Sequence, residues 1–440
     1  MSETVLIVGS GAREHAIAAA LARSPQRPVL LCFGSARNPG IVALCRDYQV
    51  GSVTDAASIC LFAAAHLPTL AVVGPEAPLA AGVADALLAM QIPVVGPTQS
   101  LARIESSKSF ARELLAKYKI PGNPFFQRFT SMEGVEELLA RTAGRHVIKD
   151  DGLAGGKGVK VCGDHLHSLE ESLAFCRELA ANGHPFVIEE KLEGEEFSLI
   201  SFCDGHVVIG MPLVQDHKRA YEGDLGPNTG GMGTYTDANQ RLPFVTQDDV
   251  RLAGNINRLV AEALEEECGW PYQGILYGGF IATGEGVRLI EYNARFGDPE
   301  CLNLLTLLET DFVQICRAIA DQTLADLQVD FAPLASVCKY VVPEGYPDAA
   351  RIGDAVQLPT VLPPGVTLYL GAVDERDGEL VATGSRTAAV VAVASTLAEA
   401  EALCEQVIQQ IPGRFFHRAD IGTEALMARR VEHMKQLRPA

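Results

Sequence analysis

The first hundred residues alternate between short apolar runs and longer stretches in which apolar positions recur at helical spacing. The apolar runs predict β-strands at Val5–Val8, Val29–Phe33, Leu70–Val73 and Pro93–Val95. The stretches between them predict helices, the clearest at Arg13–Arg23 and Ala80–Met90. Strands and helices in alternation build a parallel sheet with helices on its faces, so this region predicts a doubly wound α/β unit.

The pattern changes after residue 100. Residues 101–120 predict one helix with an apolar face, which Ser106 or Ser107 can cap, and a segment rich in proline and glycine follows it. Residues from about 123 to 195 predict a small α+β unit with a helix near Glu170–Ala181. The chain therefore leaves the regular alternation of its first region here.

Residues from about 196 to 325 predict antiparallel strands and two long helices. We expect these helices near Asp248–Glu267 and Pro299–Ala320. Asp330–Ala335 is a plausible linker, and short strands after it precede a helix at Leu397–Ile411. A chain of 440 residues is long enough for two to four such units, each with a sizeable core.

Composition narrows the class of protein. The chain is 48% hydrophobic and 21% charged, as globular proteins are, and its net charge of −19 disfavours a general nucleic-acid binder. Small anionic ligands remain possible because they need only a local basic pocket. No apolar run is long enough to span a bilayer, and the eleven unpaired cysteines without a secretion signal fit a reducing compartment. We expect a cytoplasmic protein that binds neither nucleic acid nor membrane.

A glycine-rich segment at Gly152–Gly158 is the clearest candidate for contacts with phosphate. Four of its seven residues are glycine, and Lys157 lies among them. Nearly bare backbone can wrap closely around phosphates and point its N–H groups at them. The flanks, His146–Lys149 and Val159–Cys162, predict strands, so the segment differs from a Walker A loop, which opens a helix. We expect a phosphate-binding flap, with a merely flexible hairpin tip as the alternative.

The loop Gly9–His15 follows the first strand, where a dinucleotide-binding fingerprint would lie. Glu14 replaces the third glycine of that fingerprint, and the second strand does not end on an acidic residue, which argues against a nicotinamide cofactor. A helix N-terminus beside Arg13 suits a phosphate monoester instead. Glu76 follows another parallel strand and is expected at the same edge of the sheet. The alternative is a tight turn with surface charges.

Other charged residues are spaced as a nucleotide would require. Lys108 lies in the first turn of its helix and Lys149 on the strand that enters the flap, so both can reach phosphates. Val187–Leu192 predicts a strand that runs into a hinge, whose backbone can pair with an adenine edge. The next carboxylate, Glu195 or Glu196, can accept hydrogen bonds from ribose hydroxyls. Solvated surface charge is the alternative for this segment.

A further predicted strand presents oxygen ligands on one face. Period-two alternation places Glu291 and Asn293 together, with Arg295 next in the series. Hard oxygen ligands suit Mg²⁺ bound together with nucleotide phosphates. Gly297–Glu300 then turns into a helix whose N-terminus can face an anion. The alternative is an edge strand with a solvated polar face.

Together these motifs resemble the phosphoribosylamine–glycine ligase family of the ATP-grasp superfamily. The most specific motifs are Gly-Pro-Asn-Thr-Gly-Gly-Met-Gly at Gly226–Gly233 and Arg-Phe-Gly-Asp-Pro-Glu at Arg295–Glu300. The other motifs lie at residues 9–15, 74–79, 149–158 and 215–219. The motifs run in the family's order, and the resemblance covers nearly the whole chain.

The resemblance implies an α/β and α+β multidomain fold. It places a Rossmann-like N-terminal domain at residues 1–100, a two-lobed ATP-grasp region at 101–330 and a small C-terminal domain at 331–440. The small ATP-binding lobe would span residues of about 123–195. The implied reaction ligates glycine to 5-phosphoribosylamine through glycyl phosphate, in purine biosynthesis, with ATP as co-substrate and Mg²⁺ or Mn²⁺ as cofactor. A monomer is expected.

The resemblance also implies roles for individual residues. Catalysis is expected from Lys157, Arg295 and Asp298, and metal binding from Glu291 and Asn293. The residues implied in ATP binding are Lys108, Lys149, Gly155, Gly156, Lys157, Gly158, Glu189, Glu190, Leu192 and Glu196. The residues implied in substrate binding are Gly11, Arg13, Glu14, Glu76, Asp216, Lys218, Gly230 and Gly231.

Two positions are open at this stage. Asp150 stands where the family usually has a small residue, so its carboxylate would weaken ATP binding if it faced the phosphates. His217 suits a structural hydrogen bond as well as a chemical role. Three other functions also remain open: another ATP-grasp carboxylate activator such as a biotin carboxylase or a formate-using transformylase, a nicotinamide oxidoreductase, and a nucleotide-binding regulator that has lost activity.

Overall fold

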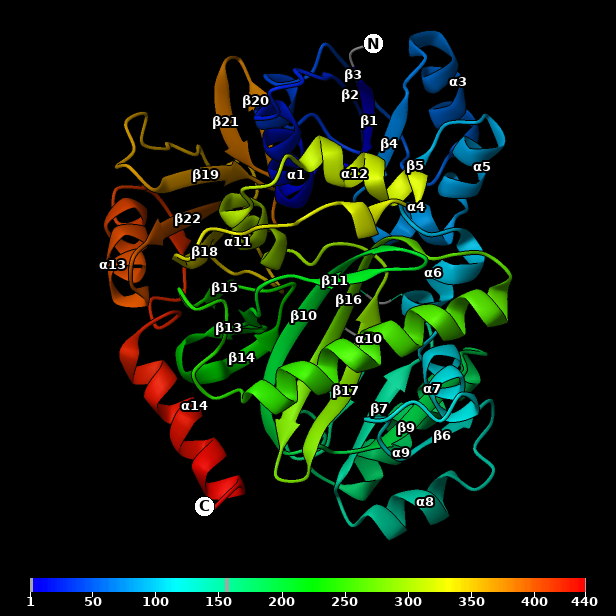
Figure 1. Cartoon of the computed structure of the whole chain (residues 1–440). Helices are drawn as coiled ribbons and strands as arrows, with labels where there is room; N and C mark the ends of the chain where they lie inside the picture. Colours follow the sequence, from blue (N-terminus) through cyan, green and yellow to red (C-terminus); the bar gives the residue numbers. More distant parts are fainter. Residues whose placement is uncertain (1–2, 154, 156–157, 440) are drawn as a thin grey trace.

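The N-terminal region forms a five-stranded parallel sheet. The protein is described from a computed structural model, which covers residues 3–153, 155 and 158–439. The sheet has the order β3-β2-β1-β4-β5, and its strands are β1 (Thr4–Val8), β2 (Val29–Gly34), β3 (Asp47–Val50), β4 (Leu70–Val73) and β5 (Val94–Val95) (Figure 1). Its helices are α1 (Ala12–Ala22), α2 (Pro39–Val42), α3 (Ala56–His66), α4 (Glu76–Ala80) and α5 (Val83–Ala89). The predicted doubly wound sheet is confirmed.

Two of the predicted helices are each divided in two. The helix expected over residues 101–120 consists of α6 (Gln99–Ser106) and α7 (Lys108–Lys117). Ser107 between them is extended, and its hydroxyl accepts a hydrogen bond from the backbone N–H of Phe110, which caps α7. The helix expected at Ala80–Met90 is likewise interrupted, because Gly82 adopts a left-handed φ of 79° between α4 and α5.

The small lobe is a four-stranded antiparallel sheet with two helices packed on it. Its strand order is β6-β9-β7-β8. The elements are β6 (Phe126–Phe129), α8 (Val135–Thr142), β7 (His146–Asp150), β8 (Val159–Val161), α9 (Leu169–Ala181) and β9 (Phe186–Glu190). Phe129, Leu139, Ile148 and Phe186 belong to an apolar core that is separate from the main core of the protein. The lobe therefore has its own core, as the sequence pattern predicted.

The large lobe is built on long antiparallel strands. Its sheet has the order β11-β10-β16-β17, and α10 packs along it (Figure 1). The elements are β10 (Gly194–Asp204), β11 (Val208–Gly210), α10 (Gln247–Cys268), β16 (Gln273–Thr283), β17 (Gly286–Asn293), α11 (Glu300–Leu307), α12 (Phe312–Asp321) and the short 3₁₀ helix η2 (Leu324–Asp326). One helix was predicted for Pro299–Ala320. That prediction is wrong, because Leu308 pairs with Phe331 in a β-bridge and Asp311 caps α12.

The C-terminal sheet combines strands from both sides of the predicted linker. Its order is β12-β15-β18-β22-β19, and β23 pairs with the end of β18. The strands are β12 (Gln215–Asp216), β15 (Gly233–Thr236), β18 (Ala335–Pro343), β19 (Val366–Leu370), β22 (Ala388–Ala394) and β23 (Phe415–Phe416). Residues on both sides of the linker thus share one sheet, which fixes the C-terminal region against the large lobe.

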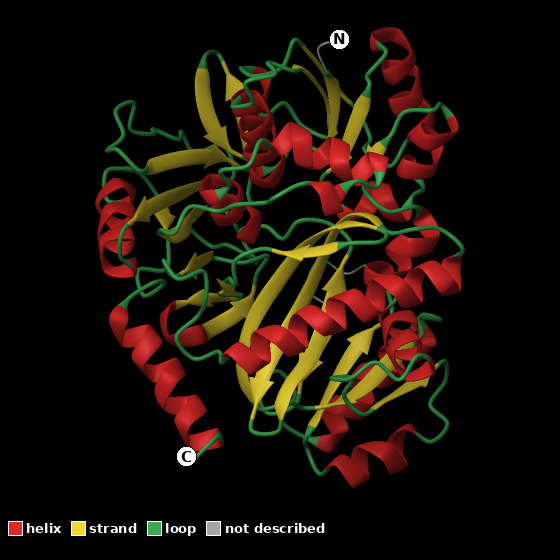
Figure 2. Ribbon diagram, in the orientation of Figure 1, coloured by secondary structure: helices red, strands yellow, loops and turns green. Residues whose placement is uncertain are grey.

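The remaining elements surround this sheet, as Figure 2 shows. They are β13 (Arg219–Tyr221), η1 (Glu222–Asp224), β14 (Leu225–Asn228), β20 (Val373–Arg376), β21 (Glu379–Ala382), α13 (Leu397–Ile408) and α14 (Glu424–Leu437). Thr396 and Glu399 form the capping box of α13, so the helix predicted there is confirmed, although it ends three residues earlier than expected. No helix among the described residues has both the length and the apolar character needed to cross a membrane.

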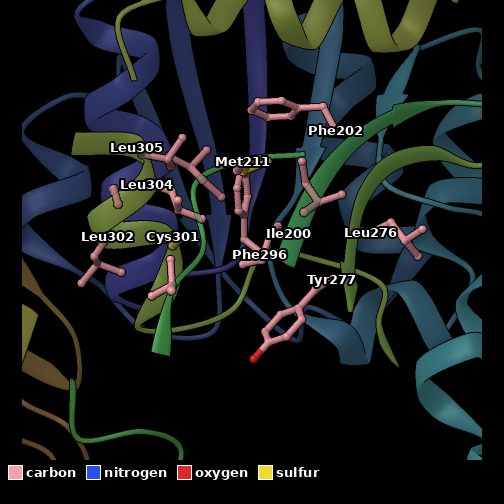
Figure 3. Close-up of a cluster of buried hydrophobic side chains, with 14 of the residues drawn as sticks. Ile200, Phe202, Met211, Leu276, Tyr277, Phe296, Cys301, Leu302, Leu304 and Leu305 are labelled. Atoms are coloured by element: carbon pink, nitrogen blue, oxygen red, sulfur yellow. The ribbon is translucent and has the colours of Figure 1, made fainter. Parts of the chain in front are cut away.

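The main apolar core runs without interruption from the N-terminal sheet into the large lobe and the C-terminal sheet. Figure 3 shows part of it, where Phe202 and Ile200 of β10 lie near Phe296 and the leucines of α11. Tyr277 of β16 lies at the edge of this group, and its hydroxyl points away from the apolar side chains (Figure 3). That hydroxyl donates a hydrogen bond to Glu300 Oε1 at 2.6 Å, so the core meets a polar site here.

Candidate active site

Most of the predicted site residues line one cleft, with a volume of about 950 Å³. Those that line it are Arg13, Glu76, Lys108, Lys149, Gly155, Gly158, Glu189, Glu190, Leu192, Glu196, Asp216, Lys218, Gly230, Glu291, Asn293, Arg295 and Asp298. Gly11, Glu14 and Gly231 are not part of the lining. Gly156 and Lys157 lie outside the described residues. The fold therefore gathers residues from the N-terminal sheet and from both lobes around one space.

Three buried charges join the two lobes inside this cleft. Arg112 of α7 donates hydrogen bonds to both carboxylate oxygens of Glu189, at 2.7 and 2.8 Å, and Lys149 Nζ lies 2.8 Å from Glu189 Oε2. Burial opposes ionisation of Glu189, but the two cations outweigh it and lower its pKa. Because both oxygens of this carboxylate are occupied, a nucleotide contact at Glu189 would have to come from its backbone.

A β-bulge in β17 shapes the opposite wall. The pairing with β16 shifts register at Ile290, whose carbonyl accepts hydrogen bonds from Lys149 Nζ at 2.9 Å and from Arg112 Nη2 at 2.7 Å. A bulge changes the direction in which the following side chains point. Glu291 and Asn293 both line the cleft beyond it. The predicted common face of these two residues is therefore confirmed.

The start of the glycine-rich segment is tied to the N-terminus of α7. Lys108 Nζ donates a hydrogen bond to Gly152 O at 2.7 Å. The carboxylate of Asp151 accepts hydrogen bonds from the backbone N–H of Ser109 at 3.0 Å and from the Ser107 hydroxyl at 3.1 Å. A carboxylate at a helix N-terminus also interacts favourably with the helix dipole. The first residues of the glycine-rich segment are therefore anchored to the N-terminus of α7.

Asp150 is directed toward His184 and not into the cleft. Its carboxylate lies 3.4 Å from His184 Nδ1, and Asp150 does not contribute to the lining of the cleft. The departure from the family pattern at this position is thus compatible with an anionic ligand in the cleft.

Glu195 and Glu196 have different environments, because consecutive residues of a strand face opposite sides. Glu195 is buried, and its carboxylate lies 2.6 Å from His433 Nδ1 and 3.3 Å from Arg430 Nε, both on α14. The side chain of Glu196 is 55% exposed and lies 3.9 Å from Lys218 Nζ. Of the two carboxylates considered for ribose, only that of Glu196 is free of a buried ion pair.

The N-terminal loop brings Arg13, rather than Glu14, to the cleft. Glu14 is buried and accepts hydrogen bonds from the backbone N–H of Gly11 at 2.6 Å and from Arg13 Nε at 2.7 Å. A Cβ atom on Gly74 would lie 2.1 Å from Glu14 Oε1, and one on Gly9 would lie 2.7 Å from Glu14 Cγ. These glycines leave room for the Glu14 side chain, which holds Arg13 in place.

Four alternating charges connect this loop to the turn that follows β17. Arg13 Nη1 lies 3.9 Å from Glu76 Oε2, which accepts a hydrogen bond from Arg295 Nε at 3.2 Å. Arg295 Nη2 lies 2.8 Å from Glu105 Oε1, and Glu105 Oε2 accepts a hydrogen bond from the backbone N–H of Ala294. Burial raises the pKa of Glu105, whereas the two arginines outweigh burial at Glu76 and lower its pKa to about 2. Arg13 and Arg295 are therefore held as neighbours by Glu76.

Glu291 lies among several cationic side chains of the protein. Lys218 Nζ lies 3.6 Å from Glu291 Oε1. Burial opposes ionisation of Glu291, but nearby cations, led by Lys218 and Lys149, lower its pKa to about 2. It is thus ionised at neutral pH, as a metal ligand must be. No group of three or more Asp, Glu, His or Cys side chains in the described ranges could hold a metal ion. A cation on Glu291 and Asn293 would need further oxygens from a nucleotide or water, which suits Mg²⁺.

The glycine-rich loop before β15 packs closely against the turn after β17. Gly231 has a φ of 112°, and a Cβ atom there would lie 2.6 Å from Pro299 Cδ and 2.7 Å from Asp216 Oδ1. Only glycine fits this position. Asp216 itself lines the cleft, and burial together with the nearby charge of Glu300 raises its pKa.

His217 directly follows β12, is buried and also lines the cleft. Its Nδ1 donates a hydrogen bond to Gly233 O at 3.2 Å, and its Nε2 has no hydrogen-bond partner. Burial lowers its pKa to about 3, so the imidazole is neutral at physiological pH. The bond to Gly233 supports the structural role that the sequence left open.

Comparison with known protein families decides to which family the chain belongs. Models of phosphoribosylglycinamide synthetase match it in three successive parts: the N domain at residues 3–105, the ATP-grasp (A) domain at 106–301 and the C domain at 336–424. The chain belongs to the phosphoribosylglycinamide synthetase family. It is therefore an ATP-grasp ligase with the three-domain architecture of that family.

Relatives of the phosphoribosylglycinamide synthetase family span the whole chain. The phosphoribosylamine–glycine ligase of Methanosarcina barkeri is 46% identical over 434 residues, which are 99% of each chain. That of Methanosarcina acetivorans is 47% identical over 438 residues, which are 100% of this chain and 98% of that one. The crystal structure of the Thermotoga maritima ligase has a TM-score of 0.80 and 28% identity, and the match covers 95% of this chain and 100% of that chain.

A more distant structure shares the fold alone. The biotin carboxylase domain of the Hydrogenobacter thermophilus 2-oxoglutarate carboxylase, solved with MgADP, ADP and bicarbonate, has a TM-score of 0.70 at 15% identity. The match covers 99% of this chain and 94% of that chain. Membership of the phosphoribosylglycinamide synthetase family excludes the other carboxylate activators considered, a biotin carboxylase and a formate-using transformylase. It also excludes a nicotinamide oxidoreductase.

Sequence reasoning missed several residues of this synthetase site, among them Glu105, Arg112 and Arg386. Glu105 could have been found, because an acidic residue on the apolar face that contains Leu101 and Ile104 signals a buried charge. Arg112 and Arg386 gave no local signal, since their partners lie far away in the sequence.

Proposed function

We propose that this cleft activates the carboxylate of glycine with ATP and joins it to the amine of 5-phosphoribosylamine. The products would be glycinamide ribonucleotide, ADP and phosphate. The observation that supports this best is the convergence of three groups of residues on one cleft. Lysines suited to phosphates, oxygen ligands suited to a cation, and the Arg13 of the N-terminal loop all contribute to it.

ATP would lie between the two lobes. Its adenine would pair with the backbone of the hinge from Glu189 to Leu192, where Glu190 also accepts a hydrogen bond from the backbone N–H of Phe125 at 2.7 Å. Glu196 would bind the ribose hydroxyls. The phosphates of ATP would contact Lys108, Lys149 and the flap. Within the flap we propose contacts from Gly155, Gly156, Lys157 and Gly158.

Glu291 and Asn293 would hold Mg²⁺ or Mn²⁺, which supplies charge neutralisation at the phosphate oxygens when bound. The neighbouring cations Lys149 and Lys218 already favour the ionised form of Glu291. Arg295 and Lys157 would add positive charge at the transferred phosphoryl group. Catalysis would thus depend on positioning and electrostatic stabilisation, as in other phosphoryl transfers.

Phosphorylation solves the difficulty that oxide is a poor leaving group from a carboxylate. A carboxylate oxygen of glycine would attack the γ-phosphorus, the bond to the β-phosphate oxygen would break, and ADP would leave. The amine of phosphoribosylamine would then attack the acyl carbon of glycyl phosphate, releasing phosphate and a proton. The closed cleft would protect the acyl phosphate from water.

The acceptor of the glycyl group, 5-phosphoribosylamine, would bind on the side of the N-terminal sheet. Glycine would bind beside the glycine-rich loop. We assign the phosphoribosyl amine to Arg13 and Glu76, with Gly11 and Glu14 holding Arg13 in position. Asp216, Lys218, Gly230 and Gly231 are proposed to contact glycine, and Asp298 to act near the reacting groups. We also propose that the enzyme is a cytoplasmic monomer.

The deciding experiment measures ADP release by the purified protein with ATP and Mg²⁺, with and without glycine plus phosphoribosylamine. Continued release of ADP over many turnovers should require both substrates. Release that depends on bicarbonate or formate would contradict the proposal, and so would ATP binding without ADP formation. Lys157→Ala should depress turnover by about 100-fold while leaving the fold intact, as expected for a group that stabilises the transferring phosphoryl.

A further inference from the structure

Arg386 reaches from the C-terminal domain into the part of the cleft that Gly230 and Asp298 line. It lies between β21 and β22 and lines the cleft together with Tyr346, Pro347, Gly384 and Ser385. All five residues come from the region after residue 330, for which neither the sequence patterns nor the mechanism above required any role. The C-terminal domain thus forms part of one wall.

The guanidinium of Arg386 connects two segments of the large lobe. Its Nη1 donates hydrogen bonds to the carbonyls of Gly230 at 2.7 Å, Gly231 at 3.1 Å and Asp298 at 2.8 Å. Its Nη2 lies 3.1 Å from Asp298 Oδ2. One side chain therefore holds both the glycine-rich loop and the turn that follows β17.

The surroundings of Arg386 fix its orientation. The guanidinium carbon lies 4.6 Å from the centre of the Tyr340 ring, and the Tyr340 hydroxyl donates a hydrogen bond to Asp298 Oδ1 at 2.5 Å. A Cβ atom on Gly230 would approach the guanidinium to 3.1 Å, so the loop and the arginine fit closely. A planar group with several fixed donors suits this arrangement, whereas an ammonium is a compact point charge.

We propose that Arg386 is a positioning residue through which the C-terminal domain sets the geometry of the glycine-binding part of the site. Arg386 holds the carbonyls of Gly230 and Gly231 in place together with the backbone carbonyl and the carboxylate of Asp298. This inference rests on the proposed function, because that function assigns glycine to the loop and a catalytic role to Asp298. The residues proposed to bind ATP are others in the cleft, so ATP binding should not depend on Arg386.

The first test is hydrogen exchange of the backbone amides, which requires no substrate. Arg386→Ala should accelerate exchange in residues 229–233 and 297–300 by about tenfold or more, with the small lobe unchanged. Arg386→Lys keeps the charge but lacks the fixed fork of donors, so it should give an intermediate acceleration. Arg376→Ala is the matched control, because Arg376 is exposed on the β20–β21 hairpin of the same domain and pairs with Asp374. Protection in Arg386→Ala and Arg386→Lys equal to that of wild type would overturn the inference.

The second test is kinetic. Arg386→Ala should lower kcat and raise the KM for glycine, with a combined loss of about 100-fold, while the Kd for MgATP changes by less than about threefold. Added guanidinium ion should restore part of the activity, which would not happen if the variant were merely unstable. Equal losses in glycine use and ATP binding, without rescue, would contradict a positioning role. An inactive wild-type protein would overturn the proposed function instead, and the exchange experiment would still decide the role of Arg386.

Discussion

Glu76 Oε2 accepts a hydrogen bond from Arg295 Nε at 3.2 Å, and this contact joins α4 of the N-terminal region to the turn after β17, the strand of the proposed metal ligands. The same oxygen lies 3.9 Å from Arg13 Nη1. Two guanidinium groups with different proposed tasks, one for phosphoribosylamine and one for the transferred phosphoryl, thus share one carboxylate. The two substrate regions of the cleft are therefore coupled by a single side chain.

Replacement of Glu76 by Gln should impair catalysis. The amide keeps the shape of the side chain but removes the charge that neutralises Arg13 and Arg295, so these arginines should repel each other and move. We expect kcat/KM for phosphoribosylamine to fall by about 100-fold. Steady-state kinetics test this, with Glu285→Gln as the control, because Glu285 pairs with Arg288 at the surface. Wild-type kinetics in Glu76→Gln would show that the shared contact has no catalytic role.

Replacement of Arg112 by Ala should destabilise the protein strongly. It would remove two hydrogen bonds from the buried carboxylate of Glu189 and leave Lys149 as its one remaining cation among the ion pairs described here. Breaking a buried ion pair by removing one partner costs about 3–5 kcal/mol. Denaturant unfolding should show this loss in the free energy of unfolding. The exposed i,i+4 pair of Arg258 and Glu262 provides the control, since Arg258→Ala should cost about 0.5 kcal/mol. Similar losses in both variants would contradict the importance of burial.

The stability of the protein should fall between pH 6.5 and pH 4, partly because of His15. Its Nδ1 accepts a hydrogen bond from the backbone N–H of Leu370 at 2.9 Å, and burial lowers its pKa from 6.5 to about 4. Below pH 6.5 the unfolded state takes up a proton that the folded state excludes, so acid favours unfolding. Through His15, the free energy of unfolding should be lower by about 3 kcal/mol at pH 4 than at neutral pH. Urea unfolding at several pH values should show a smaller decline in His15→Gln than in wild type, and an equal decline would refute the assignment.

Glu196→Gln should weaken ATP binding through the ribose. An amide accepts hydrogen bonds from hydroxyls less strongly than a carboxylate does, so we expect the Kd for ATP to rise about tenfold. The sharper measurement compares ATP with 2′,3′-dideoxy-ATP. Wild type should prefer ATP, and Glu196→Gln should lose most of that preference, which a double-mutant cycle quantifies. Glu195→Gln should keep the preference, because Glu195 pairs with Arg430 and His433 instead. An unchanged preference in Glu196→Gln would remove Glu196 from the ribose site.

The sequence predicted local structure well wherever one segment sufficed to define it. The parallel strands of the N-terminal region, the separate small lobe and the face shared by Glu291 and Asn293 are examples. It failed where a polar side chain ended a helix within an apolar pattern. Ser107 was expected as a cap, but of a single helix over residues 101–120, whereas it caps α7 after a separate α6. Asp311 caps α12 inside the single helix predicted for Pro299–Ala320. Apolar periodicity records which face is buried, and it does not record such a break.

The sequence also could not show which charges meet. Arg112 lies 77 residues from Glu189 in the chain, and Arg386 lies 88 residues from Asp298. Neither arginine belongs to a recognisable pattern with its partner. Glu14 illustrates the opposite case, because its position in the first loop suggested contact with a ligand, whereas the folded chain turns it toward Gly11 and Arg13.

By itself the sequence indicated contacts with phosphate and with a divalent cation, because glycine-rich segments, lysines and oxygen ligands at fixed spacing have local physical meaning. The reaction itself was indicated by the resemblance of the motifs to one family. Only the tertiary structure decided how these groups are arranged around one cleft and which of them hold others in place. The physical reason is that long-range ion pairs form only after the lobes have packed, and burial then sets their strength. The contribution of the C-terminal domain to the cleft wall follows from the same packing.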